Sequence, residues 1–243
     1  MSHPRFVATR RKAHGTSLRI VDLAEASLRF RRAMTHCDNL VAVHRGYGGP
    51  AQGRRTREVS VNRAVVVVTV AAWQAAVQDM VVSAIEAGEP GPGSPITRQT
   101  YSILAGRAKE NVHAFNTPNA ENTRRLLVSV GFDPRPLWTW SQMGGQGVGV
   151  ITLRPPDVEQ RMRDWLTLRH EIAHGNDTLS PVRVLQAVRE PRELSDDWQP
   201  TIRLVDAEAC MAFFRRVANL TGNGLAIELG QEGARWDLKQ VAG

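Results

Sequence analysis

The sequence predicts an all-α protein, and three observations lead to this prediction. Apolar residues recur at helical spacing through the most apolar part of the chain, residues 59–87. Stretches rich in glycine and proline, at 45–57 and 89–95, separate this segment from its neighbours. The valines at 65–68 favour a strand by propensity, but the apolar positions after them keep helical spacing. We therefore expect helices almost throughout and no sheet.

The first two helices are expected on either side of a glycine-rich linker. Residues 17–44 carry apolar positions among many charges, which predicts a moderately amphipathic helix. The linker covers 45–57, and the second helix covers 59–87 and stops before Gly88. Its apolar run at 64–77 is shorter than the ~20 residues that a membrane span needs. We expect a buried core helix and no membrane partner.

Two further helices are expected before a long irregular segment. The first covers 96–114. The second opens with Thr117 as N-cap and Pro118 in the first helical position, and ends at Gly131. Residues 133–150 hold two prolines and a glycine-rich run, which predicts a loop.

The next helix is the one that carries the candidate site. It starts at Pro155, has Asp157 in its first turn, where the helix dipole favours an acid, and should stop at Gly175. Residues 179–203 are mixed and interrupted by prolines. A last helix is expected over about 206–220.

Composition indicates a globular, basic protein with an anionic partner. The 243 residues are 42% hydrophobic, so a core can form, and the net charge is +7. Almost all the cations are arginines, with lysine only at Lys12, Lys109 and Lys239. Arginine presents a planar fork of donors that matches phosphate oxygens, which favours a nucleic-acid partner. A coding sequence rich in G and C explains the arginine bias equally well, though not the net charge.

The cysteines and the N-terminus indicate a cytoplasmic protein. Cys37 and Cys210 are far apart and lack zinc-ligand spacing, which suits buried thiols in a reducing compartment. Residues 1–19 are rich in arginine and have no apolar core of a secretory signal.

The chemistry-bearing cluster is Arg169, His170 and His174, near the end of the helix that starts at Pro155. On a helical wheel Arg169 falls inside the apolar stripe, and the two histidines, four residues apart, lie together on its flank. That stripe consists of Val158, Met162, Trp165, Ile172 and Ala173. An unpaired buried charge is costly, so Arg169 must snorkel, form a structural salt bridge or face an anion.

This cluster suits cleavage of RNA without a metal or cofactor. Histidine exchanges its proton near neutral pH, and the negative end of the helix dipole favours a protonated imidazole there. An arginine adds a fixed positive charge for phosphoryl oxygens. RNA supplies its own nucleophile, the 2′-hydroxyl, so no activated serine or cysteine is required.

The string Leu168-Arg169-His170-Glu171-Ile172-Ala173-His174-Gly175 resembles the R-x4-H motif of HEPN domains, in which a polar residue follows the arginine. The RiboL-PSP-HEPN group is the most similar. The segment at 116–122, its continuation to Phe132 and the apolar helix at 72–85 resemble that group as well. The resemblance covers about residues 60–220.

The resemblance implies an antiparallel helical bundle of HEPN type that forms a homodimer with a composite active site. His174 would act on the 2′-hydroxyl or the leaving oxygen, Arg169 on the scissile phosphate, and His170 on orientation, giving a 2′,3′-cyclic phosphate. Relatives of this type act as toxins with an antitoxin partner or as phage-defence effectors. The HEPN-like domain would cover 58–225, preceded by a basic tail, an additional helix and a linker (1–57) and followed by a C-terminal tail (226–243).

Two other interpretations use the same residues. His170-Glu171-x-x-His174 spells the signature of zinc peptidases, with Glu171 as the base. A third ligand such as Glu190 or Glu193 would then be needed, and Arg169 would have no role. A HEPN module that only dimerises or binds RNA is the other alternative.

Trp138 and Trp140, beside the glycine-rich run, are weaker candidates for RNA binding. Their rings could stack on bases. Anchoring the loop in the core is the alternative role for the pair.

Overall fold

A computed structural model describes residues 22–46, 56–91, 93–144, 149–189 and 199–237. The predicted all-α class is confirmed, since helices account for nearly all the regular structure of these residues. The helices are α1 (Leu23–Gly46), α2 (Thr56–Ala87), α3 (Pro95–Ala114), α4 (Ala120–Val128), α5 (Pro155–Ala173), α6 (Gln186–Arg189) and α7 (Leu204–Glu228). The basic tail at 1–19 and most of the predicted linker lie outside the described residues.

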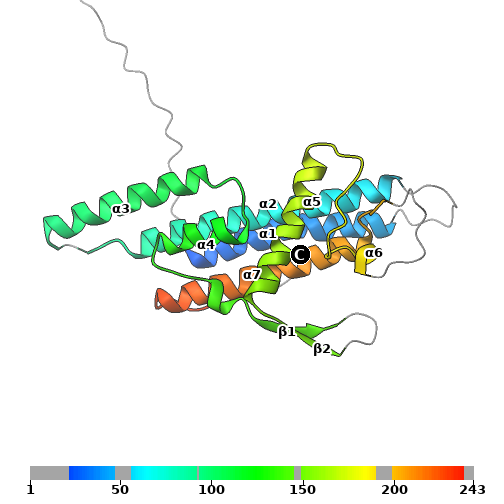
Figure 1. The fold of residues 1–243 in the computed structure, drawn as a ribbon. Coiled ribbons are helices and arrows are strands. Elements are labelled where there is room, and N and C mark those ends of the chain that lie inside the picture. Colours follow the sequence, from blue (N-terminus) through cyan, green and yellow to red (C-terminus); the bar gives the residue numbers. More distant parts are fainter. Residues whose placement is uncertain (1–21, 47–55, 92, 145–148, 190–198, 238–243) are drawn as a thin grey trace, which may run out of the picture.

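Helix α2 is the centre of the core. It lies beside α1 and α7 over much of its length (Figure 1). Trp73, Val77 and Met80 are fully buried, as expected for the most apolar segment of the chain. By length and composition α2 could cross a membrane, but its most apolar window is mostly buried within the protein. Its apolar residues thus form a protein core.

Helices α1, α2 and α7 form a layer, and helix α5 crosses this layer and packs on α2 (Figure 1). Val158, Met162 and Trp165 are buried, as the apolar stripe predicts. Ala173, expected in the same stripe, is exposed. Burial thus fades toward the C-terminal end of α5, where the candidate site lies.

The segment at 133–150 contains regular structure where a loop was predicted. A 3-10 turn, η1 (Arg135–Leu137), precedes an antiparallel pair of strands, β1 (Trp140–Met143) and β2 (Val150–Leu153). Trp140 is paired with Leu153, and both bury their side chains. Each strand has only four residues, too few for alternation to mark it in the sequence.

The predicted domain boundaries do not follow the core. Helix α1, expected as an added element, shares one core with α2 and α7. The predicted C-terminal tail also belongs to it: α7 runs to Glu228, and Trp236 is buried against Phe30. A Cβ at Gly222 would lie 2.2 Å from the Trp236 ring, so glycine is what allows this contact.

The two cysteines are free and buried, as predicted. Burial raises the pKa of the Cys37 thiol and, more strongly, that of Cys210. Both thiols are therefore protonated and unreactive at neutral pH.

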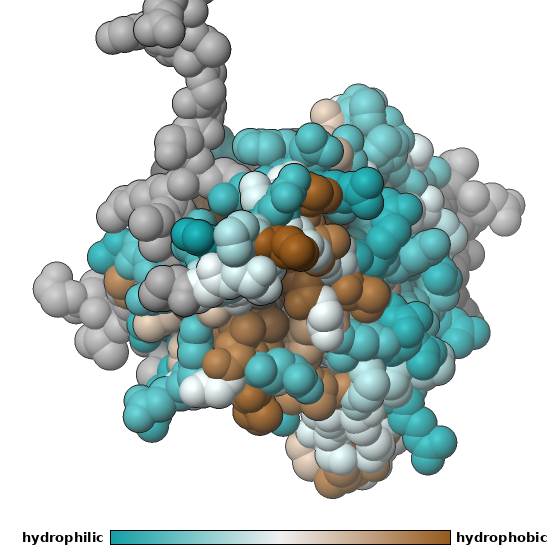
Figure 2. Space-filling model, turned by 90° about the vertical axis from the view of Figure 1, so that its left-hand side faces the viewer, coloured by the Kyte–Doolittle hydropathy of each residue, from teal (hydrophilic) through white to brown (hydrophobic). Residues whose placement is uncertain are grey.

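Helix α3 is the least buried of the long helices. Only Ala105, Ala108 and Val112 of its side chains are buried. Figure 2 shows apolar and polar side chains side by side on the end of the molecule that this helix borders. Ile96, near its start, is 75% exposed.

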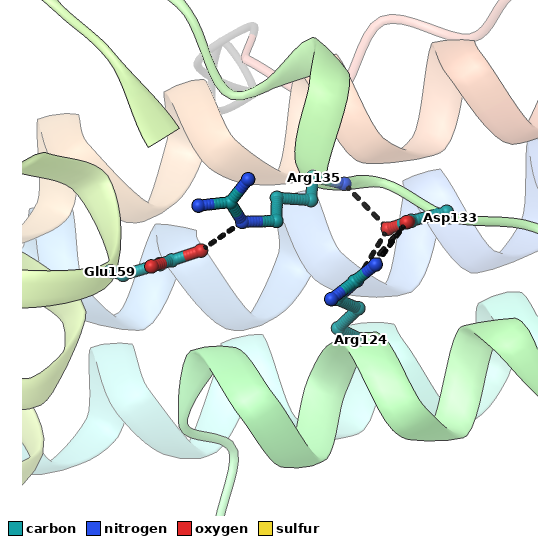
Figure 3. A network of polar contacts seen from close by, with 4 residues as sticks. All are labelled: Arg124, Asp133, Arg135 and Glu159. Atoms are coloured by element: carbon teal, nitrogen blue, oxygen red, sulfur yellow. Dashed lines mark hydrogen bonds and ion pairs between the residues drawn. The ribbon is translucent and has the colours of Figure 1, made fainter. Parts of the chain in front are cut away.

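A network of charged side chains ties α4 to the start of α5 (Figure 3). Arg124 holds both carboxylate oxygens of Asp133, at 2.6 and 2.9 Å. The neighbouring Arg135 donates to Glu159 of α5 at 2.6 Å. The segment between α4 and the strands is thereby fixed against α5.

Candidate functional site

The helix that carries the motif ends as predicted. His174 is the C-cap, and Gly175 has φ +74°, the left-handed conformation that glycine adopts without strain. The backbone N–H of Gly175 donates to the carbonyl of Ile172, and that of Asn176 to Glu171. The two histidines therefore lie in the last turn of α5.

Arg63 of α2 fixes this turn. Its guanidinium donates to the backbone carbonyls of Asn176 and Asp177, at 3.3 and 3.0 Å. A cation at this position also complements the negative end of the α5 dipole. Sequence analysis missed Arg63, because the contact joins segments more than a hundred residues apart and no local pattern marks it.

Arg169 has no carboxylate partner among the described residues. The residue is half-buried, and its Nε atom is buried without a hydrogen bond. The sequence left three roles open for Arg169, and one of them was a structural salt bridge. The described part of the chain contains no such salt bridge. The guanidinium is left available to an anion from outside.

His170 and His174 lie against each other and are both exposed. Their ring centroids are 4.2 Å apart, and the rings are tilted by 59°. Each imidazole can thus reach a bound molecule and exchange a proton with it. The two histidines therefore lie together on one flank of the helix, as predicted.

A cavity of about 320 Å³ adjoins this end of α5. On the helix side it is lined by Arg169 and His170 together with Arg163, Leu166, Thr167 and Glu171. The other wall is the loop before α4, at residues 117–119. His174 is not part of this lining and adjoins it through its contact with the His170 ring.

The loop that forms the second wall is fixed to α2. The indole N–H of Trp73 donates to the Pro118 carbonyl at 3.3 Å, and the Gln74 amide donates to Phe115 at 3.0 Å. Asn119, and not the predicted Thr117, is the N-cap of α4, since its Oδ1 accepts the Asn122 N–H at 2.7 Å. With the Pro118 carbonyl held by Trp73, the helix begins two residues later than predicted.

The described residues supply no third ligand to His170 and His174 for the zinc-peptidase interpretation. The Glu171 carboxylate accepts the backbone N–H of Ser180 at 2.9 Å and also accepts the Ser180 hydroxyl. These bonds tie the side chain of Glu171 to the loop after α5. The part of the chain that the structure describes contains no group of three histidines, cysteines or acids able to hold a metal. Glu190 and Glu193 lie outside the described residues.

The two tryptophans are core residues, and the predicted base-stacking role is wrong. Trp138 has no exposed surface, and its indole N–H donates to the Thr221 hydroxyl at 3.0 Å. Trp140 is 8% exposed and lies 6.0 Å from the ring of Phe213. Neither ring offers a face to a base, because both faces are used in packing.

Comparison with known proteins leaves the family open. No family model, no curated protein and no solved structure matches this chain.

Proposed function

We propose that this protein is a metal-independent endoribonuclease of HEPN type. The observation that supports it best is a half-buried arginine without a partner among the described residues, next to two exposed histidines at the end of one helix. A protein gains nothing in stability from a half-buried, unpaired cation. Such a cation is useful where a phosphate binds, and the net charge of +7 favours such a ligand.

In this proposal each of the three side chains has one role. Arg169 binds the non-bridging oxygens of the scissile phosphate. His174 takes the proton of the 2′-hydroxyl, or supplies one to the leaving oxygen, and His170 orients the phosphate. The 2′-oxygen attacks phosphorus, the bond to the 5′-oxygen breaks, and that oxygen leaves as a hydroxyl. The products are a 2′,3′-cyclic phosphate and a free 5′-hydroxyl, and no redox step or cofactor is needed.

A second copy of the chain would complete the site. Residues 173–178, which end α5 and follow it, are exposed, so the histidine pair has open surface around it. Two such ends facing each other would double the number of cations and imidazoles around one phosphate. A homodimer, a cytoplasmic location and a toxin or phage-defence role with an antitoxin or other regulatory partner all belong to this proposal.

The test is cleavage of a labelled RNA by the purified protein in excess EDTA. We expect cleavage that survives chelation, leaves a cyclic phosphate, and falls at least about 100-fold in His174→Ala and Arg169→Ala. Arg107→Ala is the matched control, because Arg107 is an exposed helical arginine that does not line the cavity beside Arg169. Stoichiometric bound Zn²⁺ and hydrolysis of a peptide, without RNA cleavage, would support the peptidase instead. RNA binding without any cleavage would support the non-catalytic module.

The salt dependence of RNA binding is a second test. Each phosphate contact releases counterions, so affinity should fall steeply as salt rises. An affinity that does not change with salt would contradict contact with the RNA backbone.

A further inference from the structure

A second cavity adjoins α5, away from the end that carries the histidines. It encloses about 290 Å³ and is bounded by the first half of α5, by β2, by α7 and by the segment around α6. Three arginines line it: Arg161, Arg183 and Arg189. It shares no lining residue with the cavity beside Arg169.

Arg161 is the central cation of this cavity. It is half-buried, and within the described ranges it forms neither a hydrogen bond nor an ion pair. Burial lowers the pKa of its guanidinium, and repulsion from Arg189 is the next largest cause. Arg161 and Arg189 therefore line one cavity, and neither forms an ion pair with a carboxylate of the described residues.

The two acids in the cavity wall do not supply the missing anion. Asp157 accepts the backbone N–H of Arg154 at 2.9 Å and so caps the start of α5. Asp164 is 5% exposed and accepts the Gln160 amide at 2.7 Å. Both acids attract Arg161, and the buried Asp206 attracts Arg189, but none of the three forms an ion pair with these arginines among the described residues.

Two other half-buried arginines of this protein form ion pairs. Arg215 meets Asp38 at 2.6 Å, and Arg135 meets Glu159 at 2.6 Å. Three guanidiniums without an ion pair among the described residues therefore surround one cavity, and this matches the requirement of a ligand with several negative oxygens.

The rest of the lining restricts what that ligand can be. Between the arginines the wall is apolar, with Leu153, Val184 and Phe213. A phosphate alone would leave this apolar surface without a partner. The space of about 290 Å³ is of the size of one small organic phosphate, and a folded polymer cannot enter it.

We infer that this cavity binds a phosphate monoester of mononucleotide size, with the three arginines around the phosphate and the organic part on the apolar wall. The inference does not depend on the proposed ribonuclease activity, because the two cavities have no residue in common. Both lie on α5, so a ligand here contacts the helix that carries Arg169.

The test is calorimetric titration of the full chain with AMP, GMP, inorganic phosphate and adenosine. We expect the nucleotides to bind with Kd below about 1 mM, inorganic phosphate to bind more weakly, and adenosine not to bind. Arg161→Gln should weaken nucleotide binding at least about tenfold, since it removes a charge-assisted contact. Arg183→Gln should also weaken it, and because Arg183 is exposed this variant should fold as the wild type does.

Two control variants locate the binding. Arg107→Gln removes an exposed helical arginine remote from both cavities and should bind as the wild type does. Arg169→Ala should also bind normally, because Arg169 lines only the other cavity. The inference is overturned if the wild type binds no nucleotide at 1 mM. It is equally overturned if both glutamine variants at 161 and 183 bind unchanged, or if Arg169→Ala alone abolishes binding.

Discussion

Two arginines of the helical layer formed by α1, α2 and α7 contrast with two arginines of the crossing helix α5. In the layer, Arg29 pairs with Asp79 and Arg215 with Asp38, so both bridge neighbouring helices, although Arg31 of α1 has a buried Nε without a hydrogen bond. In α5, Arg161 and Arg169 have no carboxylate partner within the described residues. Both are half-buried, so exposure to water does not explain the difference.

This difference separates arginines that stabilise the fold from arginines that are available to bind a ligand. A paired arginine has its charge compensated in the folded chain, and removing it strands a carboxylate. An unpaired, half-buried arginine carries a desolvation cost that a bound anion can offset. Arg29 and Arg215 therefore stabilise the helical layer, and Arg161 and Arg169 present charge to outside molecules.

The largest expected effect is on stability and concerns a side chain in the core. Trp138→Ala should lower the free energy of unfolding by about 3–5 kcal/mol, since it leaves a cavity and strands the Thr221 hydroxyl. Urea unfolding followed by circular dichroism measures it. Trp138→Phe, which keeps most of the volume, is the control and should lose less. A stable Trp138→Ala protein with weakened RNA affinity would restore the base-stacking role.

The next effect compares two arginines directly. Arg215→Met should lower the free energy of unfolding by about 1–3 kcal/mol, because it removes the ion pair with Asp38 in a mostly buried place. Arg169→Met keeps the aliphatic stem and strands no carboxylate, so its change should stay within about 0.5 kcal/mol. Equal losses in the two variants would remove the distinction between the layer and α5.

A smaller effect is expected at the contact that joins the layer to α5. Arg63→Ala should cost about 1 kcal/mol of stability, because two carbonyls after α5 lose their donor. If Arg63 positions the end of α5, RNA cleavage should fall about tenfold or less, with the loss mainly in kcat. Arg63→Lys, which keeps one donor, should recover part of the rate. A rate identical to the wild type would show that the turn holds without Arg63.

The smallest effect concerns the network of Figure 3 and depends on pH. The hydrogen bonds from Arg124 lower the pKa of Asp133 below its ordinary value. The ionised carboxylate thus stabilises the fold above the unfolded pKa of about 4, and this contribution is lost as the pH falls through the folded pKa. Asp133→Asn should lower Tm at pH 7 by no more than about 2 °C, because the pair is partly exposed. At pH 3 the difference from the wild type should be smaller, and a constant difference would exclude the charge as its cause.

Features with a local cause could be predicted from the sequence. The helix at 59–87 was predicted from its spacing and is found as α2, and the stop at Gly175 follows from the conformation that glycine permits. The predicted end of α4 at Gly131 is three residues too late, since α4 ends at Val128, and the turn that follows reaches this glycine at φ +89°. In each case neighbouring residues along the chain determine the result.

Features that depend on distant residues could not be predicted. The burial of Trp138 requires Thr221, and the turn after α5 requires Arg63, each more than eighty residues away. The same holds for the cavity around Arg161, which α7 and the segment around α6 complete. The sequence did predict that Arg169 and the two histidines lie together, because they share one helix. That Arg169 has no carboxylate partner became visible only with its surroundings.

The most direct test of the account is one preparation of Arg169→Met, measured for both RNA cleavage and unfolding. We predict that cleavage is at least about 100-fold slower than in the wild type, with the free energy of unfolding within about 0.5 kcal/mol of it. Unchanged cleavage would contradict the account, and so would a loss of cleavage that merely follows a loss of folded protein.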